Sequence, residues 1–192
     1  MTDKPATPGK TAFANWRDYI IYIGFVAIFL IFAVTLGDRG FLDPNNLLNI
    51  IRQTAIIAVV SVTMTFVLST GEIDLSVGAV AGLASVVTAM AIDQFGIAGG
   101  ILCGLGTGVL VGAVNGWLTT AVGIPSFLTT LAMMGIARGA AMWVSGTAAI
   151  PILSKTYTGI FGAGNLGPVP SLLIWVLVIG IAGHIVLRRT TF

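Results

Sequence analysis

Residues 69–78 read STGEIDLSVG, and they place two acidic side chains between two apolar runs. The run from Ala55 to Leu68 precedes this stretch, and the run from Val77 to Ile92 follows it. A charge at the centre of a bilayer costs about 2.5–3.5 kcal/mol on insertion scales, so carboxylates inside membrane proteins usually have a function. Glu72 and Asp74 are therefore the first candidates for a functional site.

The composition predicts an integral membrane protein. The chain has 192 residues, of which 56% are hydrophobic and 8% are charged. A soluble domain carries about 25% charged residues, so these few charges could not cover a surface exposed to water. The net charge is +2, and the basic residues are not clustered as they are in proteins that bind nucleic acid. Membrane lipid is the expected surrounding, and no nucleic-acid partner is expected.

Apolar segments of membrane length follow one another along the chain, since a spanning helix needs roughly 17–25 apolar residues. They are residues 19–36, 47–68, 75–92, 97–122, 127–144 and 172–187. The pattern predicts an all-α, polytopic transmembrane bundle of about six spans. We expect residues 1–18 to form a cytoplasmic N-terminal tail and residues 19–192 to form the membrane domain.

The positions of Lys and Arg predict the orientation, because cytoplasmic loops are enriched in both. Six spans put both chain ends on one side. That side holds Lys4, Lys10, Arg17, Arg188 and Arg189, and the opposite side holds Arg39 and Lys155. The N-terminus is therefore expected in the cytoplasm. If residues 127–144 were re-entrant, the C-terminus would lie outside and the rule would be violated.

Polar side chains in or beside the predicted spans are the candidate gating or structural positions. They are Glu72, Asp74, Ser76, Asn115 and Arg138. Arg138 is the cation deepest in a span and needs a partner, for which Glu72 or Asp74 is the candidate. Asp74 or Ser76 could cap the helix that begins nearby, or could belong to a gate. Asn115 is expected to hydrogen-bond between helices.

Five glycines recur every four residues in the segment 97–122, at positions 100, 104, 108, 112 and 116. Such a row lies along one face of a helix and lets a neighbouring backbone approach closely. We expect these glycines to serve helix packing rather than substrate contact. No Ser-His-Asp set, Cys/His metal spacing or phosphate loop is found in the sequence. No enzyme activity, catalytic residue, metal or cofactor is therefore expected.

Four sequence motifs resemble those of permease subunits in bacterial ABC importers of monosaccharides, of the ribose, xylose, arabinose and galactose types. Residues 71–78, GEIDLSVG, resemble the family's GGIDLSVG, with Glu72 where that pattern has Gly. Residues 115–116 (NG), 124–131 (IPSFLTTL) and 135–139 (GIARG) resemble three further family motifs, and their order and spacing agree. The resemblance covers nearly everything from residue 41 onward.

The resemblance implies a permease subunit of the bacterial inner membrane that does not itself hydrolyse ATP. It also implies an ABC ATPase subunit, a periplasmic sugar-binding protein and a second permease subunit in a homodimer. Pro125, Phe127 and Thr130 join the polar positions above as positions that match family motifs. Members of the family are markedly longer, so the chain is expected to be an N-terminal portion, incomplete at its C-terminus and unable to transport alone.

Two other interpretations are compatible with the residues. An ion- or proton-coupled secondary carrier would use Glu72, Asp74 and Arg138 as coupling charges, in the broken helices that such carriers contain. A membrane scaffold that transports nothing is the third. Dependence of uptake on ATP rather than on an ion gradient separates the first two classes.

Overall fold

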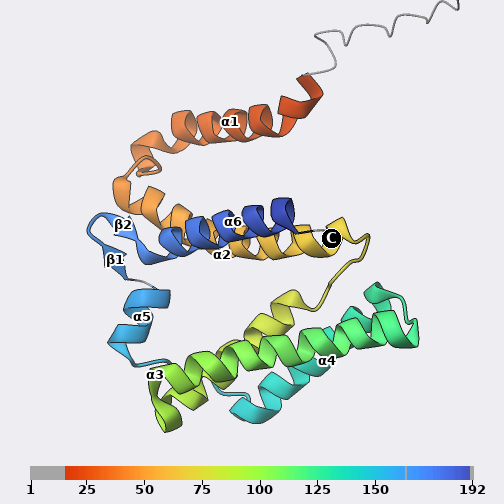
Figure 1. Cartoon of the computed structure of the whole chain (residues 1–192). Coiled ribbons are helices and arrows are strands. Elements are labelled where there is room, and N and C mark those ends of the chain that lie inside the picture. Colours follow the sequence, from red (N-terminus) through yellow and green to blue (C-terminus); the bar gives the residue numbers. More distant parts are fainter. Residues whose placement is uncertain (1–15, 163, 191–192) are drawn as a thin grey trace, which may run out of the picture. The chain divides into compact units, whose positions relative to one another are not determined.

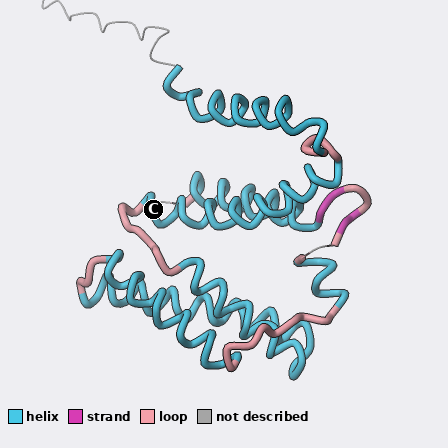
Figure 2. The backbone as a smooth tube through the Cα atoms, turned by 180° about the vertical axis from the view of Figure 1, so that it is seen from behind, coloured by secondary structure: helices cyan, strands magenta, loops and turns pink. Residues whose placement is uncertain are grey.

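The structure is a computed structural model, and it describes residues 16–162 and 164–190. Helices dominate the described chain (Figures 1 and 2). The elements are α1 (Trp16–Leu36), the 3₁₀ helix η2 (Gly37–Arg39), α2 (Pro44–Ser69), α3 (Val77–Trp117), the π-helix η3 (Leu118–Val122), α4 (Ser126–Ser145), α5 (Lys155–Phe161), β1 (Asn165–Leu166), β2 (Val169–Pro170) and α6 (Ser171–Arg189). The predicted all-α class is confirmed. Most of the predicted N-terminal tail, residues 1–15, lies outside the described residues.

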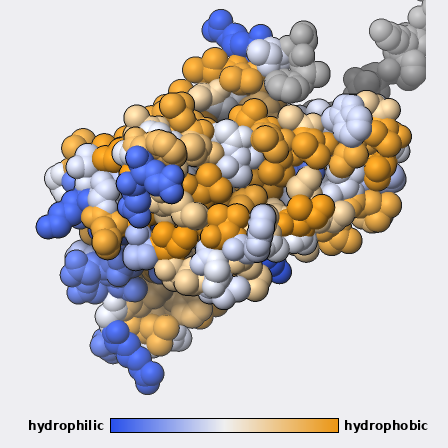
Figure 3. Space-filling view, turned by 90° about the horizontal axis from the view of Figure 1, so that it is seen from below, coloured by the Kyte–Doolittle hydropathy of each residue, from blue (hydrophilic) through white to orange (hydrophobic). Residues whose placement is uncertain are grey.

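Five helical stretches of the described chain are long and apolar enough to cross a membrane. They are Tyr19–Arg39, Pro44–Ser69, Val77–Val122, Ser126–Ser145 and Ser171–Arg189. On the face shown in Figure 3, apolar residues cover most of the surface. Helices that face lipid expose apolar surface of this extent. They can cross the bilayer because each helix satisfies its own backbone hydrogen bonds. The chain is a multi-pass membrane protein.

The third stretch contains two predicted spans, because α3 turns back on itself at Gly96. This residue has φ 72° and ψ −177°, a backbone conformation found almost only at glycine. A Cβ added to Gly100 or Gly104 would meet Thr88 on the preceding half of the helix. Residues so far apart could not touch in a straight helix, so residues 77–95 and 97–117 run antiparallel (Figure 1). The six predicted segments are thus present in five helical stretches.

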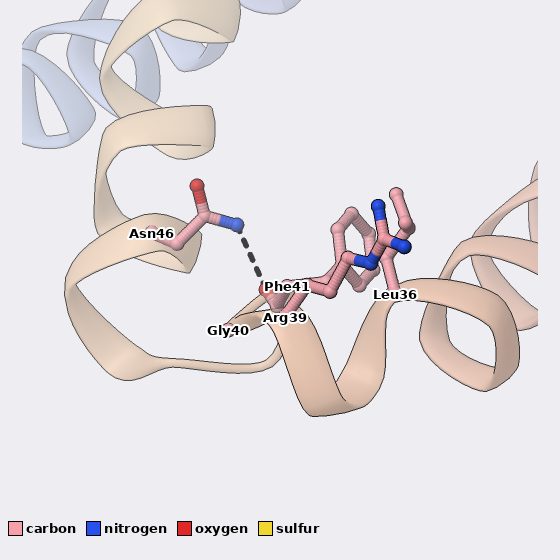
Figure 4. Close-up of a pocket in the computed structure, with 5 residues that line it drawn as sticks. All are labelled: Leu36, Arg39, Gly40, Phe41 and Asn46. Carbon is pink, nitrogen blue, oxygen red and sulfur yellow. Dashed lines mark hydrogen bonds between the residues drawn. The ribbon is translucent and has the colours of Figure 1, made fainter.

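The two units of the chain are residues 1–50 and residues 51–192. In the first unit, a compact turn joins α1 to α2. Phe41 lies against Phe29 and Phe32 of α1, with ring centroids 5.6 and 5.7 Å apart. The Asn46 amide donates a hydrogen bond of 2.8 Å to the Phe41 carbonyl, as Figure 4 shows. Gly40 permits the turn, because it takes φ 86° in the left-handed region.

In the second unit, the closest packing joins the α3 hairpin to α4. The buried residues of α4 are Thr129, Thr130, Met133 and Ala137. Small and hydroxyl-bearing residues of this kind are typical of helix interfaces in membranes, where lipid removes the hydrophobic drive for helices to associate. This packing positions the polar residues described below.

A second group of contacts in this unit involves α2, α5 and α6. Gly183 of α6 faces Val62 and Phe66 of α2, which a Cβ at that position would meet. Phe161 of α5 stacks on Trp175 of α6 with ring centroids 5.1 Å apart. The segment 145–170, which connects the predicted spans 127–144 and 172–187, therefore contains a short helix and a two-stranded hairpin.

Candidate functional site

The acidic stretch opens with a helix-ending motif at the end of α2. Gly71 has φ 80°. Its N–H donates to the Leu68 carbonyl at 3.1 Å, and the Glu72 N–H donates to the Val67 carbonyl at 3.2 Å. These two bonds form a Schellman motif, in which glycine adopts the left-handed conformation just after a helix. Gly71 therefore ends α2 and begins a non-helical segment, residues 71–76.

Asp74 folds this segment onto Ser76. Its Oδ1 accepts a hydrogen bond from the Ser76 N–H at 2.7 Å and another from the Ser76 hydroxyl at 2.6 Å. Such an Asx turn is a local bond between an aspartate and the backbone two residues on. No side chain caps α3 at Ser76, so the helix cap, one of the two roles left open for these residues, is not formed there. The carboxylate holds the turn that precedes the helix instead.

Asn115, in the second half of α3, extends this bonding across the hairpin. Its Nδ2 donates to the Ser76 hydroxyl at 3.1 Å, which in turn donates to Asp74. Ser76 is fully buried, and Asn115 is 8% exposed. Hydrogen bonds in series polarise one another in a low-dielectric interior. Asn115 thus makes a hydrogen bond between the two halves of the hairpin, in agreement with the expectation from its position.

The start of α4 binds the other side of the segment. The Ser126 hydroxyl accepts a hydrogen bond from the Ile73 N–H at 3.2 Å, and the Thr130 hydroxyl accepts one from the Leu75 N–H at 3.1 Å. Backbone groups without helical partners need such acceptors. Ser126 was missed as a site residue by sequence reasoning, because its partner is 53 residues away.

A cavity of about 450 Å³ lies among these elements, within the range of about 300–1,000 Å³ typical of ligand sites. Glu72, Asp74 and Asn115 contribute polar groups to its wall. Hydroxyl groups come from Thr70, Thr119, Thr120, Ser126 and Thr130. Most of the lining residues therefore bear side-chain oxygens, although the greater part of the exposed lining surface is apolar.

The last glycines of the row in α3 open the cavity rather than pack against a helix. Gly112 and Gly116 both line it. A Cβ added at Gly108, Gly112 or Gly116 would meet nothing within 4 Å, whereas Gly100 and Gly104 are in close contact with the other half of the hairpin. The packing expectation is met for Gly100 and Gly104 only.

The π-helix η3 forms another part of the wall through Thr119 and Thr120. It ends at Gly123, which has φ 81°. π-helical turns are rare and are frequent at functional sites. Here the wider turn lies between Asn115 and the start of α4, at the junction of the two elements that hold the acidic segment.

Four predicted positions do not line the cavity, namely Ser76, Pro125, Phe127 and Arg138. Pro125 precedes α4 and Phe127 is 49% exposed. Arg138 is exposed on α4 and, in the described part of the chain, forms no ion pair with Glu72 or Asp74. Since a helix rises about 1.5 Å per residue, Arg138 lies about 12 Å along α4 from Thr130. The predicted pairing of Arg138 with an acidic residue is therefore wrong.

Two buried polar atoms near the site have no hydrogen-bond partner, Asn115 Oδ1 and Thr129 Oγ1. Leaving a buried acceptor unpaired costs about 1–3 kcal/mol, so each atom needs an explanation. Among the described residues, no group of three or more His, Cys, Asp or Glu side chains could hold a metal ion. The chemistry that this site offers is hydrogen bonding.

Comparisons with known proteins give the family. A family model described as branched-chain amino acid transport system / permease component matches residues 46–192. The L-arabinose ABC transporter permease protein AraH of Azospirillum brasilense is 34% identical over 99% of this chain and 56% of its own length. The ribose import permease protein RbsC of Bacillus subtilis is 35% identical over 80% of this chain and 52% of its own length.

A third relative, the xylose transport system permease protein XylH of Escherichia coli, is 39% identical over 65% of this chain and 32% of its own length. The chain therefore spans about half the length, or less, of these relatives. No solved structure matches it. The relatives are transporter subunits rather than enzymes, and they bear out the resemblance to monosaccharide importers. The chain belongs to the permease component family of the branched-chain amino acid transport system.

Proposed function

We propose that the chain is a permease subunit of an ATP-driven ABC importer that moves a monosaccharide across the bacterial inner membrane. The observation that carries this proposal is the match to permeases of three importers named for arabinose, ribose and xylose. The hydrogen-bonding groups of the cavity beside the acidic segment support it, because a sugar path through apolar helices needs such groups. Because the chain spans about half of its relatives, the activity of the whole importer rests on more than these residues.

The partners follow from the same proposal. A separate ABC ATPase subunit hydrolyses ATP, a periplasmic sugar-binding protein delivers the substrate, and a second permease subunit completes the path as a homodimer. Residues 1–18 form a cytoplasmic tail, and residues 19–192 form part of the membrane domain. Asp74, Ser76, Asn115 and Thr130 have a structural or gating role, since their hydrogen bonds join the segment 71–76 to α3 and α4.

The remaining predicted positions have separate parts in this proposal. Glu72 lines the cavity. Arg138 is exposed on α4 and forms no ion pair with Glu72 in the described part of the chain. Pro125 and Phe127 shape the entry into α4, where the Pro125 carbonyl accepts from the Leu128 and Thr129 N–H groups at 3.0 and 3.1 Å. The contacts of Pro125 support a structural role for Pro125 and Phe127 rather than a direct role in transport.

Uptake in a reconstructed importer tests the function. The chain is expressed in a bacterium that lacks its arabinose, ribose and xylose permeases, together with the ATPase and binding protein of an arabinose importer. The part of the arabinose relative outside the matched region is added as a separate chain in half of the cultures. We expect uptake of labelled sugar only when both chains are present, with inhibition by vanadate and no inhibition by a protonophore. Labelled leucine is the control that addresses the family description.

Two outcomes would contradict the proposal. Uptake that a protonophore abolishes and vanadate does not would favour the secondary carrier. Uptake of leucine without uptake of any sugar would keep the importer class and overturn the substrate class.

Thiol labelling tests the orientation. In a Cys103→Ala background, Ala6→Cys reports on the N-terminal tail and Thr147→Cys on the exposed residue after α4. We expect a membrane-impermeant maleimide to label only Thr147→Cys in intact cells, and to label both positions after the cells are opened. Labelling of Ala6→Cys in intact cells would reverse the orientation.

A further inference from the structure

We propose that the cavity beside residues 71–76 binds one monosaccharide molecule, with the Asn115 amide oxygen and the acidic side chains accepting hydrogen bonds from the sugar hydroxyls. This inference rests on the proposed function and assigns the substrate to a place within it. It is carried by the buried unpaired acceptor, by the hydrogen bonding of the lining residues and by the open glycine wall.

The hydrogen bonds around Ser76 fix the orientation of the Asn115 amide. The Ser76 hydroxyl donates its one proton to Asp74, so it can only accept from Asn115. The amide must then present Nδ2 to Ser76 and direct Oδ1 away from it, and Oδ1 is the atom without a partner. Asn115 is 8% exposed and lines the cavity. A ligand with a hydroxyl donor would complete its bonding.

The threonine hydroxyls of the cavity wall have acceptor capacity to spare. The hydroxyls of Thr70, Thr120 and Thr130 already donate to backbone carbonyls at 2.7–2.8 Å. Their remaining capacity is to accept, as is that of ionised carboxylates. The wall therefore offers an excess of acceptors, and a ligand that carries several O–H donors on a small frame matches it.

Two glycines of α3 leave open space in the cavity. Gly112 and Gly116 are four residues apart and lie on one face of α3, so both can border the same ligand. A side chain at either position would extend into open space that belongs to the cavity. A bulky substitution there should block the ligand without removing any hydrogen bond of the protein.

The experiment measures binding of labelled arabinose, ribose and xylose to the purified chain in lipid nanodiscs. Gly112→Leu fills the cavity. Gly106→Leu is the matched control, since Gly106 lies in the same half of α3, has open space around it and does not line the cavity. One extra or missing methylene in a hydrophobic pocket changes discrimination by about 10–200-fold, and a leucine side chain is larger than a methylene. We expect Gly112→Leu to weaken sugar binding by about tenfold or more and Gly106→Leu to leave it unchanged.

Asn115→Leu is the second variant and tests the unpaired acceptor. Asn115→Asp keeps an acceptor oxygen at this position, and we expect this variant to bind the sugar better than Asn115→Leu does. Circular dichroism and gel filtration show which variants are folded, and the glycine pair remains decisive if both Asn115 variants fail to fold.

Three results would overturn the inference. They are the absence of binding of all three sugars, equal binding by Gly112→Leu and the unchanged chain, and binding of leucine or lysine in place of sugar. None of them would by itself contradict the uptake experiment, because an importer could carry sugar by another path. Loss of uptake with intact binding would contradict the proposed function alone.

Discussion

The helix α1 and the pair formed by α3 and α4 show opposite relations between apolarity and burial. Among the five candidate spans, the one that contains α1 is the most apolar and has no buried residue, whereas α4 is the least apolar and the most buried. Ile21 and Val34 of α1 are 77% and 84% exposed. In lipid an apolar side chain gains little by leaving the bilayer, so small and polar residues decide where helices pack.

The largest expected effect is at Asp74, within the more buried region. Asp74→Ala would leave the Ser76 N–H and hydroxyl without an acceptor. Hydrogen bonds to a charged group contribute about 1.5–3 kcal/mol, and we expect the free energy of unfolding to fall by about 3 kcal/mol. Chemical denaturation in detergent, followed by circular dichroism, measures it.

Glu72→Gly is the matched control for this change. Glu72 stands where the family pattern that residues 71–78 resemble has glycine, and no hydrogen bond of its side chain is found in the described structure. The change should therefore be mild for stability. Equal losses from the two substitutions would remove the distinction between the two carboxylates.

A smaller effect is expected at Gly104, where the two halves of α3 touch. Gly104→Leu would place a side chain against Thr88, and overpacking a close contact costs about 1–3 kcal/mol. We expect a loss of about 2 kcal/mol in the same denaturation assay. Gly24→Leu on α1 has open space around it and should change little. A similar loss at Gly24 would show that local crowding does not explain the effect at Gly104.

The smallest of the three effects is expected at Thr130. Thr130→Val keeps the shape of the side chain and removes the acceptor of the Leu75 N–H, with an expected loss of about 1–2 kcal/mol. Thr35→Val on α1 is the control, because its hydroxyl bonds only to the carbonyl of Ile31 in the same helix at 2.7 Å. If the Thr35 variant lost as much stability as the Thr130 variant, the contrast between α1 and α4 would fail.

Particular residues show where sequence reasoning succeeded. Gly71 and Gly96 both follow or interrupt an apolar run, and both take positive φ angles in the structure. A glycine between apolar segments is a strong local signal, since other residues rarely adopt that backbone. Separating the two spans near residue 95 was therefore possible without coordinates.

The pairing of polar side chains was harder to predict. Charge alone suggested Arg138 as the partner of an acidic residue, but the structure places a serine, an asparagine and two hydroxyl-bearing residues of α4 around the segment 71–76. Opposite charge predicts attraction but not proximity. Likewise, the regular glycine row predicted one packed face, and only its first two members are packed.

The sequence by itself determined that this is a multi-pass helical membrane protein of the permease family. Composition and segment length suffice for the membrane class, because a chain in lipid must satisfy its backbone hydrogen bonds within each helix. The sequence motifs carry the likeness to the permease family. Tertiary structure alone decided which polar groups meet. Ser76 and Asn115 are 39 residues apart, and Leu75 and Thr130 are 55 apart. Their contact depends on the reversal of α3 at Gly96 and on the packing of α4, which no local pattern encodes.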